Sequence, residues 1–290
     1  MKRILIAGCS GHLGRYVVAA LRGDDYFQRG LCLDFNLIPE IAASCNESIS
    51  ADLTKPTTLK GVCDNIDIVF SSAGASLDPR ALGDRSSYYS VDHIGNRNLL
   101  AEAQRAGVKR FVYVSVFGAQ NSRHLQYADA HERFVDELKS SGMSYGILRP
   151  TGFFGIFNEI FDLAVAGRAI QIGNGSSLTN PIHEADLAEA CIEAMFEQNN
   201  IERDIGGPEV LTRLQTSELA FEALGKPSKV ISIPPALFKM AGLFVRPINP
   251  RIYNLLEFGR EVSLSKVVAP MYGKRKLAEY YRELAVNRES

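Results

Sequence analysis

The stretch that decides the fold is Ile4-Leu5-Ile6-Ala7-Gly8-Cys9-Ser10-Gly11-His12-Leu13-Gly14. Its first four residues form a short apolar run, which is typical of a strand buried on both faces. Beyond the glycines, apolar residues recur at helical spacing, so we expect a helix that packs back on this strand. These helical positions are Leu13, Val17, Val18 and Leu21. The stretch therefore predicts a strand, a tight glycine turn and a helix in direct succession.

The glycines of this turn indicate a ligand. Glycine is needed where the backbone turns sharply and where a side chain would strike a bound pyrophosphate. The helix that follows offers unpaired N–H groups and the positive end of its dipole to phosphate oxygens. Because the turn lacks the Gly-Lys-Ser/Thr ending of a nucleoside-triphosphate loop, we expect a nicotinamide dinucleotide; an ordinary glycine-rich turn is the alternative. The expected pyrophosphate-binding residues are Gly8, Ser10, Gly11, His12, Leu13 and Gly14.

Strand and helix patterns alternate through the first half of the chain. We expect strands at 31–33, 66–70, 111–114 and 145–148, and helices at 90–106 and 127–140. In helix 90–106 the expected inward residues are Ile94, Asn98 and Ala101. Strict alternation implies a parallel sheet with right-handed crossovers.

The predicted fold class is therefore α/β, a Rossmann-type doubly wound parallel sheet with a smaller C-terminal substrate lobe. Residues 1–150 form the predicted dinucleotide-binding region. Residues 151–290 form the predicted substrate lobe, part of which completes the sheet.

Composition excludes several classes of protein. Apolar residues make up 46% of the 290 residues, which suffices for a large core, and the net charge is −1. The basic residues are spread out, so we expect no nucleic-acid partner. The five cysteines show no C-x-x-C spacing and are expected to be reduced thiols in a cytoplasmic protein. No histidine or acidic residue has metal-ligand spacing.

The apolar segment 234–261 has a helical period broken by Pro247 and Pro250. No uninterrupted apolar stretch reaches the roughly 18 residues of a membrane-spanning helix, so we expect no integral membrane segment. In decreasing order of expectation, the segment packs on the core, forms a subunit interface such as a homodimer, or touches a membrane surface.

Asp34 bears on the choice of cofactor. It follows the second predicted strand, 20 residues after Gly14. A carboxylate there accepts hydrogen bonds from adenosine ribose hydroxyls and repels a 2′-phosphate, which favours NAD over NADP. Two observations leave the alternative open, because Arg15 could meet a 2′-phosphate and Asp34 could be a solvated loop residue.

Several further motifs resemble one family. They are Ala51-Asp52-Leu53, Ser71-Ser72-Ala73-Gly74, Gly107-Val108-Lys109-Arg110-Phe111-Val112-Tyr113-Val114-Ser115, Leu148-Arg149-Pro150 and Ile182-His183-Glu184-Ala185-Asp186. Together with the glycine spacing, they resemble the short-chain dehydrogenase/reductase superfamily. The nearest likeness is to its atypical branch of NmrA-like and complex I accessory-subunit-like NAD(P)-binding proteins. The resemblance covers roughly residues 1–210.

The resemblance implies further cofactor contacts. Asp52 and Leu53 would flank the adenine, and Ala73 and Gly74, with Ser72 beside them, would pass under the cofactor. The stretch from Pro150 to Phe153 would line the far face of the nicotinamide. The phenylalanines at 153, 154, 157 and 161 are either plain core packing or the apolar wall of a substrate pocket.

The resemblance also implies a catalytic set of Ser115, Tyr127 and the fourth residue after this tyrosine. Active members of the family have lysine there, one helical turn on, and its charge lowers the pKa of the tyrosine. This chain has His131 instead. A histidine with an ordinary pKa near 6.5 is mostly neutral at pH 7 and gives less help.

Other residues could carry protons or mimic the motif. A second Tyr-x-x-x-Lys, Tyr272 to Lys276, lies far beyond the sheet-forming region and is interpreted as chance. His124 and His183 are further candidates for proton transfer, each more readily explained as structural.

The sequence leaves two functions open. The first is an NAD(P)-dependent oxidoreductase acting on a small, partly apolar carbonyl, alcohol or enone. The second is a redox sensor or an assembly or accessory protein that binds NAD(P) without turning it over. The missing lysine favours the second, and the glycine loop fits both.

Overall fold

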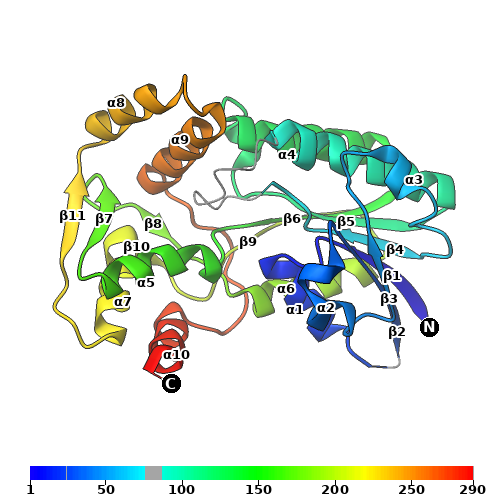
Figure 1. Ribbon diagram of the computed structural model, residues 1–290, viewed down its shortest axis with the longest axis horizontal. Helices are drawn as coiled ribbons and strands as arrows, with labels where there is room; N and C mark the ends of the chain where they lie inside the picture. Colours follow the sequence, from blue (N-terminus) through cyan, green and yellow to red (C-terminus); the bar gives the residue numbers. More distant parts are fainter. Residues whose placement is uncertain (24, 76–86, 290) are drawn as a thin grey trace. The chain divides into compact units, whose positions relative to one another are not determined.

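The computed structural model describes residues 1–23, 25–75 and 87–289 (Figure 1). The chain divides into two compact units. The first comprises Met1–Arg149 and Leu187–Arg203, and the second comprises Pro150–Asp186 and Asp204–Ser290. Among the described residues, no helix is both long enough and apolar enough to cross a bilayer.

A seven-stranded sheet runs in the order β3-β2-β1-β4-β5-β6-β9. Its strands are β1 Lys2–Ala7, β2 Tyr26–Cys32, β3 Glu47–Ser50, β4 Ile68–Ser71, β5 Arg110–Val114, β6 Ser144–Pro150 and β9 Ile201–Ile205. The pairs from β3 across to β6 are all parallel. The chain therefore reverses its direction of winding beside β1, and the predicted Rossmann-type class is confirmed.

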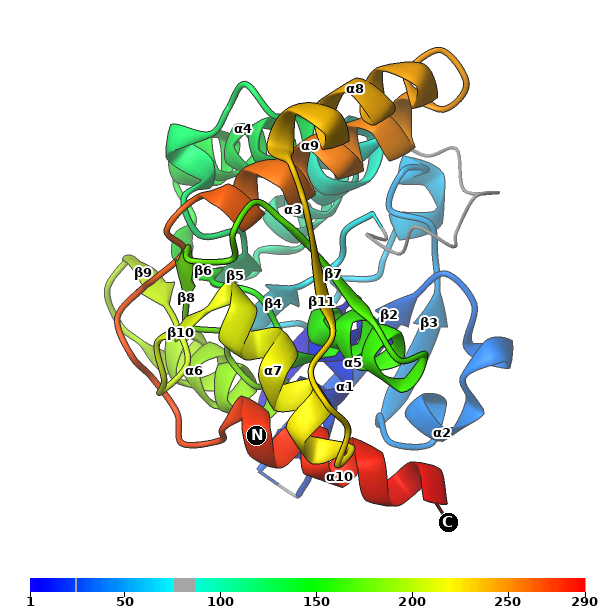
Figure 2. The same ribbon diagram turned by 90° about the vertical axis from the view of Figure 1, so that its left-hand side faces the viewer.

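Helices cover both faces of this sheet (Figures 1 and 2). Helices α3 (Asn96–Ala106) and α4 (Gln126–Ser140) lie on one face, and α1 (His12–Ala20) and α6 (Glu184–Phe196) on the other. The core between the sheet and the first pair contains Leu5, Val69, Phe111, Leu99 and Phe134. Short segments complete the unit: α2 Pro39–Ala42, a π-helix Tyr89–Gly95 and 3-10 turns Phe35–Leu37, Pro56–Leu59 and Ala119–Asn121.

The helix predicted at 90–106 differs from expectation in its inward face. The prediction was wrong for Ile94 and Ala101, which are exposed, whereas Leu99, Leu100 and Ala103 are buried. Asn98 is half-buried, and its side-chain amide donates to the Leu53 carbonyl at 2.9 Å. The π-helix before α3 adds one residue to its turn, so the helical phase counted from Ile94 does not carry into α3.

The second unit has its own core. Its helices are α5 Asn158–Val165, α7 Arg213–Ala223, α8 Pro235–Val245, α9 Pro250–Leu264 and α10 Leu277–Glu289. Its strands are β7 Ala169–Ile172, β8 Leu178–Thr179, β10 Leu211–Thr212 and β11 Val230–Ile233. A 3-10 turn spans Phe154–Phe157. Phe154, Phe157 and Phe161 are buried in this core, which supports their interpretation as packing residues. Phe153 is half-buried.

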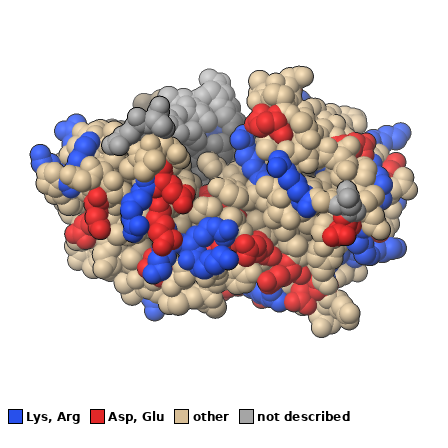
Figure 3. Space-filling model, turned by 90° about the horizontal axis from the view of Figure 1, so that it is seen from below, with Lys and Arg blue, Asp and Glu red and all other residues tan. Residues whose placement is uncertain are grey.

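Acidic and basic side chains alternate on the face shown in Figure 3, and neither sign forms a broad patch there. This distribution agrees with the near-zero net charge of −1.

Candidate cofactor and catalytic site

The glycine turn between β1 and α1 is closely packed. Gly8 has a φ of +80°, and a Cβ there would lie 2.8 Å from the backbone nitrogen of Ala73. A Cβ on Gly14 would lie 2.1 Å from the carbonyl oxygen of Gly8. Two of the three glycines are thus required by the turn and by its approach to neighbouring backbone.

The amino end of α1 fits a phosphate group. Gly11 is the N-cap residue and provides no side-chain hydrogen bond, and the first turn contains no acidic residue. The backbone N–H groups of His12, Leu13 and Gly14 belong to this first turn, which has no partners for them within the helix. A dinucleotide pyrophosphate would find both donors and a favourable dipole here. The imidazole of His12 is exposed beside them.

The residues expected around the adenosine follow β2 and β3. Asp34 comes just after β2, and its Oδ1 accepts a hydrogen bond from the Asn36 N–H at 2.8 Å. Asp52 comes just after β3 and accepts hydrogen bonds from the N–H and hydroxyl of Thr54. Burial alone would raise the pKa of Asp52, but the bonds from Thr54 and Lys55 together lower it, so this carboxylate is ionised. Leu53 is buried.

The segment after β4 is held by two polar side chains from the helical stretch 89–106. Asn96 donates to the carbonyl of Ala73 at 3.0 Å and contacts the Ser71 hydroxyl at 2.5 Å. Asp92 accepts a hydrogen bond from the Ala75 N–H, and a Cβ on Gly74 would lie 2.5 Å from its carboxylate. The buried hydroxyl oxygen of Ser72 has no hydrogen-bond partner among the described residues.

His131 does not take over the role of the lysine that it replaces. Its Nδ1 lies 2.6 Å from the hydroxyl oxygen of Tyr113, and its Nε2 lies 3.3 Å from the Asp92 carboxylate without the alignment of a hydrogen bond. The Tyr127 ring meets the imidazole edge to face, with ring centroids 4.7 Å apart. The structure thus brings Tyr127 and His131 together as packed rings.

Burial determines the protonation of this cluster. Desolvation lowers the pKa of His131 to about 3, so the imidazole is neutral at physiological pH. Desolvation also raises the pKa of Tyr127 well above its usual value near 10, and the Asp92 carboxylate raises it further. Tyr127 therefore keeps its proton, and no cation from His131 activates it.

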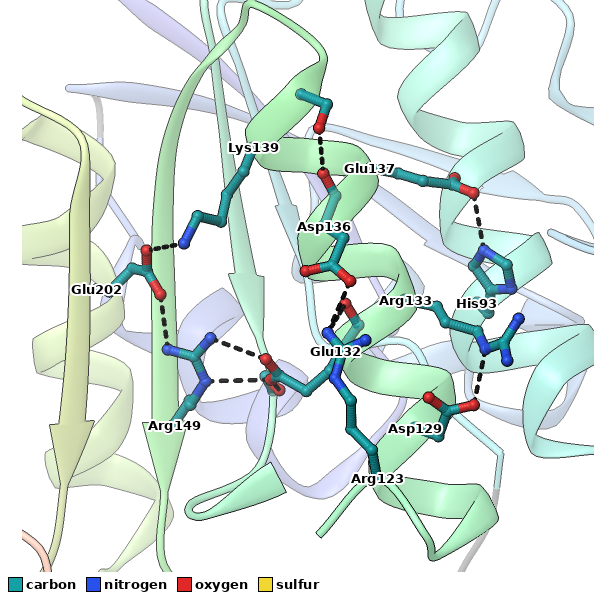
Figure 4. A network of polar contacts seen from close by, with 12 residues as sticks. His93, Arg123, Asp129, Glu132, Arg133, Asp136, Glu137, Lys139, Arg149 and Glu202 are labelled. Carbon is teal, nitrogen blue, oxygen red and sulfur yellow. Dashed lines mark hydrogen bonds and ion pairs between the residues drawn. The ribbon is translucent and has the colours of Figure 1, made fainter. Parts of the chain in front are cut away.

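Ser115 lies directly after β5 and contacts Glu132, which belongs to the charged network shown in Figure 4. Its hydroxyl donates to Glu132 Oε1 at 2.9 Å. Both carboxylate oxygens of Glu132 accept hydrogen bonds from the Arg149 guanidinium at 3.1 Å, and Arg149 also pairs with Glu202 at 3.0 Å. Ser115 is therefore held by a fixed carboxylate on α4.

Other predicted residues lie elsewhere. Pro150 and Phe153 belong to the second unit, where Phe153 forms an isolated bridge with Ile182. Tyr272 and Lys276 precede α10 and are not on a helical turn. Nδ1 of His183 accepts the Ala185 N–H, and burial lowers the pKa of His183.

Sequence reasoning missed five residues that organise the first unit's site. They are Asp92, Asn96, Tyr113, Glu132 and Arg149. All five are buried polar or phenolic residues. Four of them bond or contact a residue that the sequence did single out, and Arg149 pairs with Glu132, which in turn holds Ser115. The i, i+4 pair Asp92 and Asn96 was the one visible sign, because it marks one helical face.

The comparisons with known proteins agree with this geometry. A family model described as NAD(P)H-binding matches residues 8–198. Divinyl chlorophyllide a 8-vinyl-reductase from Arabidopsis thaliana is 26% identical over 97% of this chain and 76% of its own length. Photosystem II assembly factor Ycf39 from Trieres chinensis is 24% identical over 90% of this chain and 78% of its own length.

Among solved structures, the NADPH complex of a quinone oxidoreductase from Escherichia coli has a TM-score of 0.73 at 21% identity. The match covers 98% of this chain and 99% of the other, and shows a shared fold. The resemblance to the atypical short-chain dehydrogenases/reductases is thus confirmed at the family level. The glycine turn, the parallel sheet and the family match together show that the chain belongs to the NAD(P)H-binding family, with an oxidoreductase-type fold.

Proposed function

We propose that this chain is an NAD(P)H-dependent reductase of a small, partly apolar, conjugated acceptor such as an enone. The observation that carries the proposal is the packing of Tyr127 against the buried His131, with ring centroids 4.7 Å apart, in a site where desolvation keeps both rings uncharged. Tyr127 keeps its proton because its pKa is raised, and His131 is neutral because its pKa is about 3. Such a pair can donate a proton but is a poor base, which suits reduction rather than alcohol oxidation.

The nature of the acceptor follows from the strength of the acid. Hydride addition to a simple ketone creates a localised alkoxide, which needs an activated proton donor. Addition to a conjugated acceptor creates a delocalised anion that is stable without immediate protonation, so hydride transfer needs little assistance from an acid as weak as a tyrosine of raised pKa. The absence of a lysine four residues after Tyr127 therefore favours the enone among the three substrate classes.

We assign the following roles to the residues of the chain. The cofactor, when bound, supplies the hydride. The first turn of α1 and Ser72 would hold the cofactor, and the proposed contacts at Asp34, Asp52 and Leu53 would hold its adenosine. Ser115 gives its one hydroxyl proton to Glu132, so it would offer the substrate only an acceptor oxygen, and the Tyr127 hydroxyl would donate the proton to the reacting oxygen. Pro150 and Phe153 stay proposed nicotinamide contacts.

The relatives support a reductive reaction. One is named a vinyl-reductase, and the structurally similar protein is named a quinone oxidoreductase. The first name specifies a vinyl group and the second a quinone, and neither specifies a simple ketone or an alcohol.

A non-catalytic role is the second candidate, because one relative is named an assembly factor and His131 replaces the motif lysine. In that case the glycine turn would bind NAD(P) as a ligand and the Tyr127–His131 pair would be structural.

A substrate panel separates the two candidates. NADH and NADPH oxidation is followed with an enone, a quinone, a ketone and an aldehyde. We expect turnover with the conjugated acceptors, and a loss of at least about tenfold in kcat for Tyr127→Phe with unchanged cofactor affinity. Tyr145→Phe, at the amino end of β6, is the matched control. Tight cofactor binding with no turnover of any acceptor would establish the non-catalytic role.

We further propose that the cofactor is NADH. The Asp34 carboxylate follows β2, where ribose hydroxyls are recognised, and the Arg15 guanidinium is turned to the Ser10 carbonyl at 2.9 Å and to Glu40 at 3.7 Å. Calorimetric titration should show at least about tenfold tighter binding of NADH than of NADPH, and Asp34→Ala should remove the difference. Tighter binding of NADPH would transfer the selecting role to Arg15.

The five free cysteines support a reducing compartment, and we propose the cytoplasm.

A further inference from the structure

Arg213 is the first residue of α7, and both its backbone and its side chain are held in place. Its backbone N–H donates to the carbonyl of Ser177, just before β8, at 2.9 Å. The guanidinium Nη2 donates to the carbonyl of Val262, in the last turn of α9, at 2.9 Å. All three residues belong to the second unit, so the charge of Arg213 is fixed within that unit.

The rest of the Arg213 guanidinium has no hydrogen-bond partner. Its Nε is buried, and neither Nε nor Nη1 makes a hydrogen bond within the part of the chain that the structure describes. The buried Arg110 is the contrast, because each of its three side-chain nitrogens donates to a carbonyl or hydroxyl oxygen. Arg110 is thus satisfied as a structural residue, whereas most donors of Arg213 are unused.

Burial makes the charge of Arg213 costly. Desolvation lowers the pKa of its guanidinium to about 10 and is the one cause of the shift, so no charged group of the described residues offsets the burial. The Val262 carbonyl, at the end of α9, supplies only part of a negative charge. A desolvated cation without a counter-charge destabilises a fold, and a bound anion removes that penalty.

The guanidinium of Arg213 is open to a ligand at one nitrogen. Unlike Nε, the unbonded Nη1 is not buried, and the residue as a whole is half-buried. Helix α9, which Arg213 contacts, has no fully buried residue. The core packing that was the first expectation for the segment 234–261 is therefore not observed in α9. A ligand can thus reach Nη1 without displacing a packed core.

We propose that Arg213 binds a carboxylate group of the acceptor substrate. The inference rests on the reductase proposed above, and it narrows the acceptor to a conjugated compound that carries a carboxylate. A guanidinium donates strong, directed hydrogen bonds to carboxylate oxygens and tolerates partial desolvation. A phosphate, with nearly two negative charges at neutral pH, favours a cluster of cations. The single isolated charge of Arg213 matches the single charge of a carboxylate.

A matched pair of enones tests the proposal. The first is para-carboxybenzylideneacetone, which carries a carboxylate on its ring, and the second is its uncharged methyl ester. Both are titrated calorimetrically into the full chain with saturating NAD⁺, so that no hydride transfer occurs. We expect the acid to bind at least about tenfold more tightly than the ester. Arg213→Gln should remove this difference by weakening the acid alone, and Arg213→Lys should restore part of it.

The matched control is Arg260→Gln. Arg260 is also half-buried and lies on α9, but its guanidinium pairs with Glu257 at 3.1 Å, so its loss should leave the affinity for the acid unchanged. Circular dichroism and retained NADH binding show that each variant is folded. The comparison of acid with ester in the unmodified chain needs no variant and decides the question even where Arg213→Gln is unstable.

Equal affinity of the unmodified chain for acid and ester, or no binding of the acid, would overturn the proposal. So would an unchanged affinity for the acid in folded Arg213→Gln, or tighter binding of inorganic phosphate than of the acid. NADH oxidation separates this inference from the reductase itself. Binding of the acid through Arg213 without turnover would contradict the reductase and leave the carboxylate site standing. Turnover of acid and ester with the same KM would do the reverse.

Discussion

His131 shows how a single buried side chain sets the chemistry of its neighbours. Its imidazole is 5% exposed and contacts Tyr113, Tyr127 and Asp92. Charging this ring would place a cation in a desolvated site, which is why its pKa falls to about 3. The histidine therefore acts on Tyr127 as a neutral packing partner, unlike a lysine.

The depressed pKa of His131 makes stability depend on pH. An unfolded histidine binds a proton below about pH 6.5, whereas the folded one stays neutral down to about pH 3, so acid favours unfolding. The stability is fully present above pH 6.5 and is lost as the pH falls. We expect about 2 kcal/mol less stability at pH 5 than at pH 7.5 from this group.

Urea unfolding at the two pH values measures this difference. His131→Gln should flatten the dependence by this amount, and His12→Gln, which removes an exposed imidazole, should not. An equal pH dependence in the unmodified chain and in His131→Gln would show that His131 is not the group responsible.

The catalytic rate should not follow a titration near neutral pH. The pKa of His131 lies near 3 and that of Tyr127 lies above 10, so neither group changes its charge between about pH 6 and pH 9. A plot of kcat against pH for enone reduction should be flat over this range. A limb near pH 7 would mean that another group, or an activated Tyr127, transfers the proton.

At the scale of elements, Gly14 controls how α1 packs against the end of β1. A Cβ at this position would lie 2.1 Å from the Gly8 carbonyl oxygen, far inside van der Waals contact. The helix cannot move away without opening the turn that presents its first N–H groups. Packing and phosphate binding therefore depend on the same glycine.

Gly14→Ala should lower the stability by more than about 2 kcal/mol and abolish NADH binding, as measured by urea unfolding and calorimetry. Gly259→Ala is the control, because Gly259 also lies in a helix but a Cβ there meets nothing within 4 Å. It should stabilise α9 by up to about 1 kcal/mol. Normal NADH binding by Gly14→Ala would contradict the proposed binding of the pyrophosphate at the glycine turn.

The contact between α4 and β6 depends on a buried ion pair. The side chains of Arg149 and Glu132 are 6% and 3% exposed. Removing one partner leaves an uncompensated buried charge, so Glu132→Ala should cost about 3–5 kcal/mol in urea unfolding. Asp136 is also on α4 and forms an exposed ion pair with Arg123. Asp136→Ala should lower the free energy of unfolding by less than about 1 kcal/mol. Equal losses of unfolding free energy in the two variants would show that the buried ion pair stabilises the fold no more than the exposed one.

For the whole molecule, local patterns predicted the fold well. The apolar runs, the glycine turn and the helical period of α1 and α4 are properties of neighbouring residues, and the Rossmann-type sheet follows from them. The inward face of α3 could not be predicted, because the π-helix that shifts its phase has no marker in the sequence.

Pairings distant in sequence could not be predicted either. Tyr113 meets His131 across 18 residues, and Glu132 meets Arg149 across 17, because β5, α4 and β6 are brought together by the folded sheet. The identity of His131 was visible in the sequence, but its neutrality depends on burial that only the packed structure provides.

We propose above that this chain moves hydride from a nicotinamide cofactor to a conjugated acceptor. The most direct test uses NADH or NADPH deuterated at the nicotinamide C4, with an enone as acceptor and mass spectrometry of the product. We expect one deuterium on carbon in the product, and at least about tenfold less product with Tyr127→Phe. A chain that binds the cofactor but yields no deuterated product from any conjugated acceptor would contradict it.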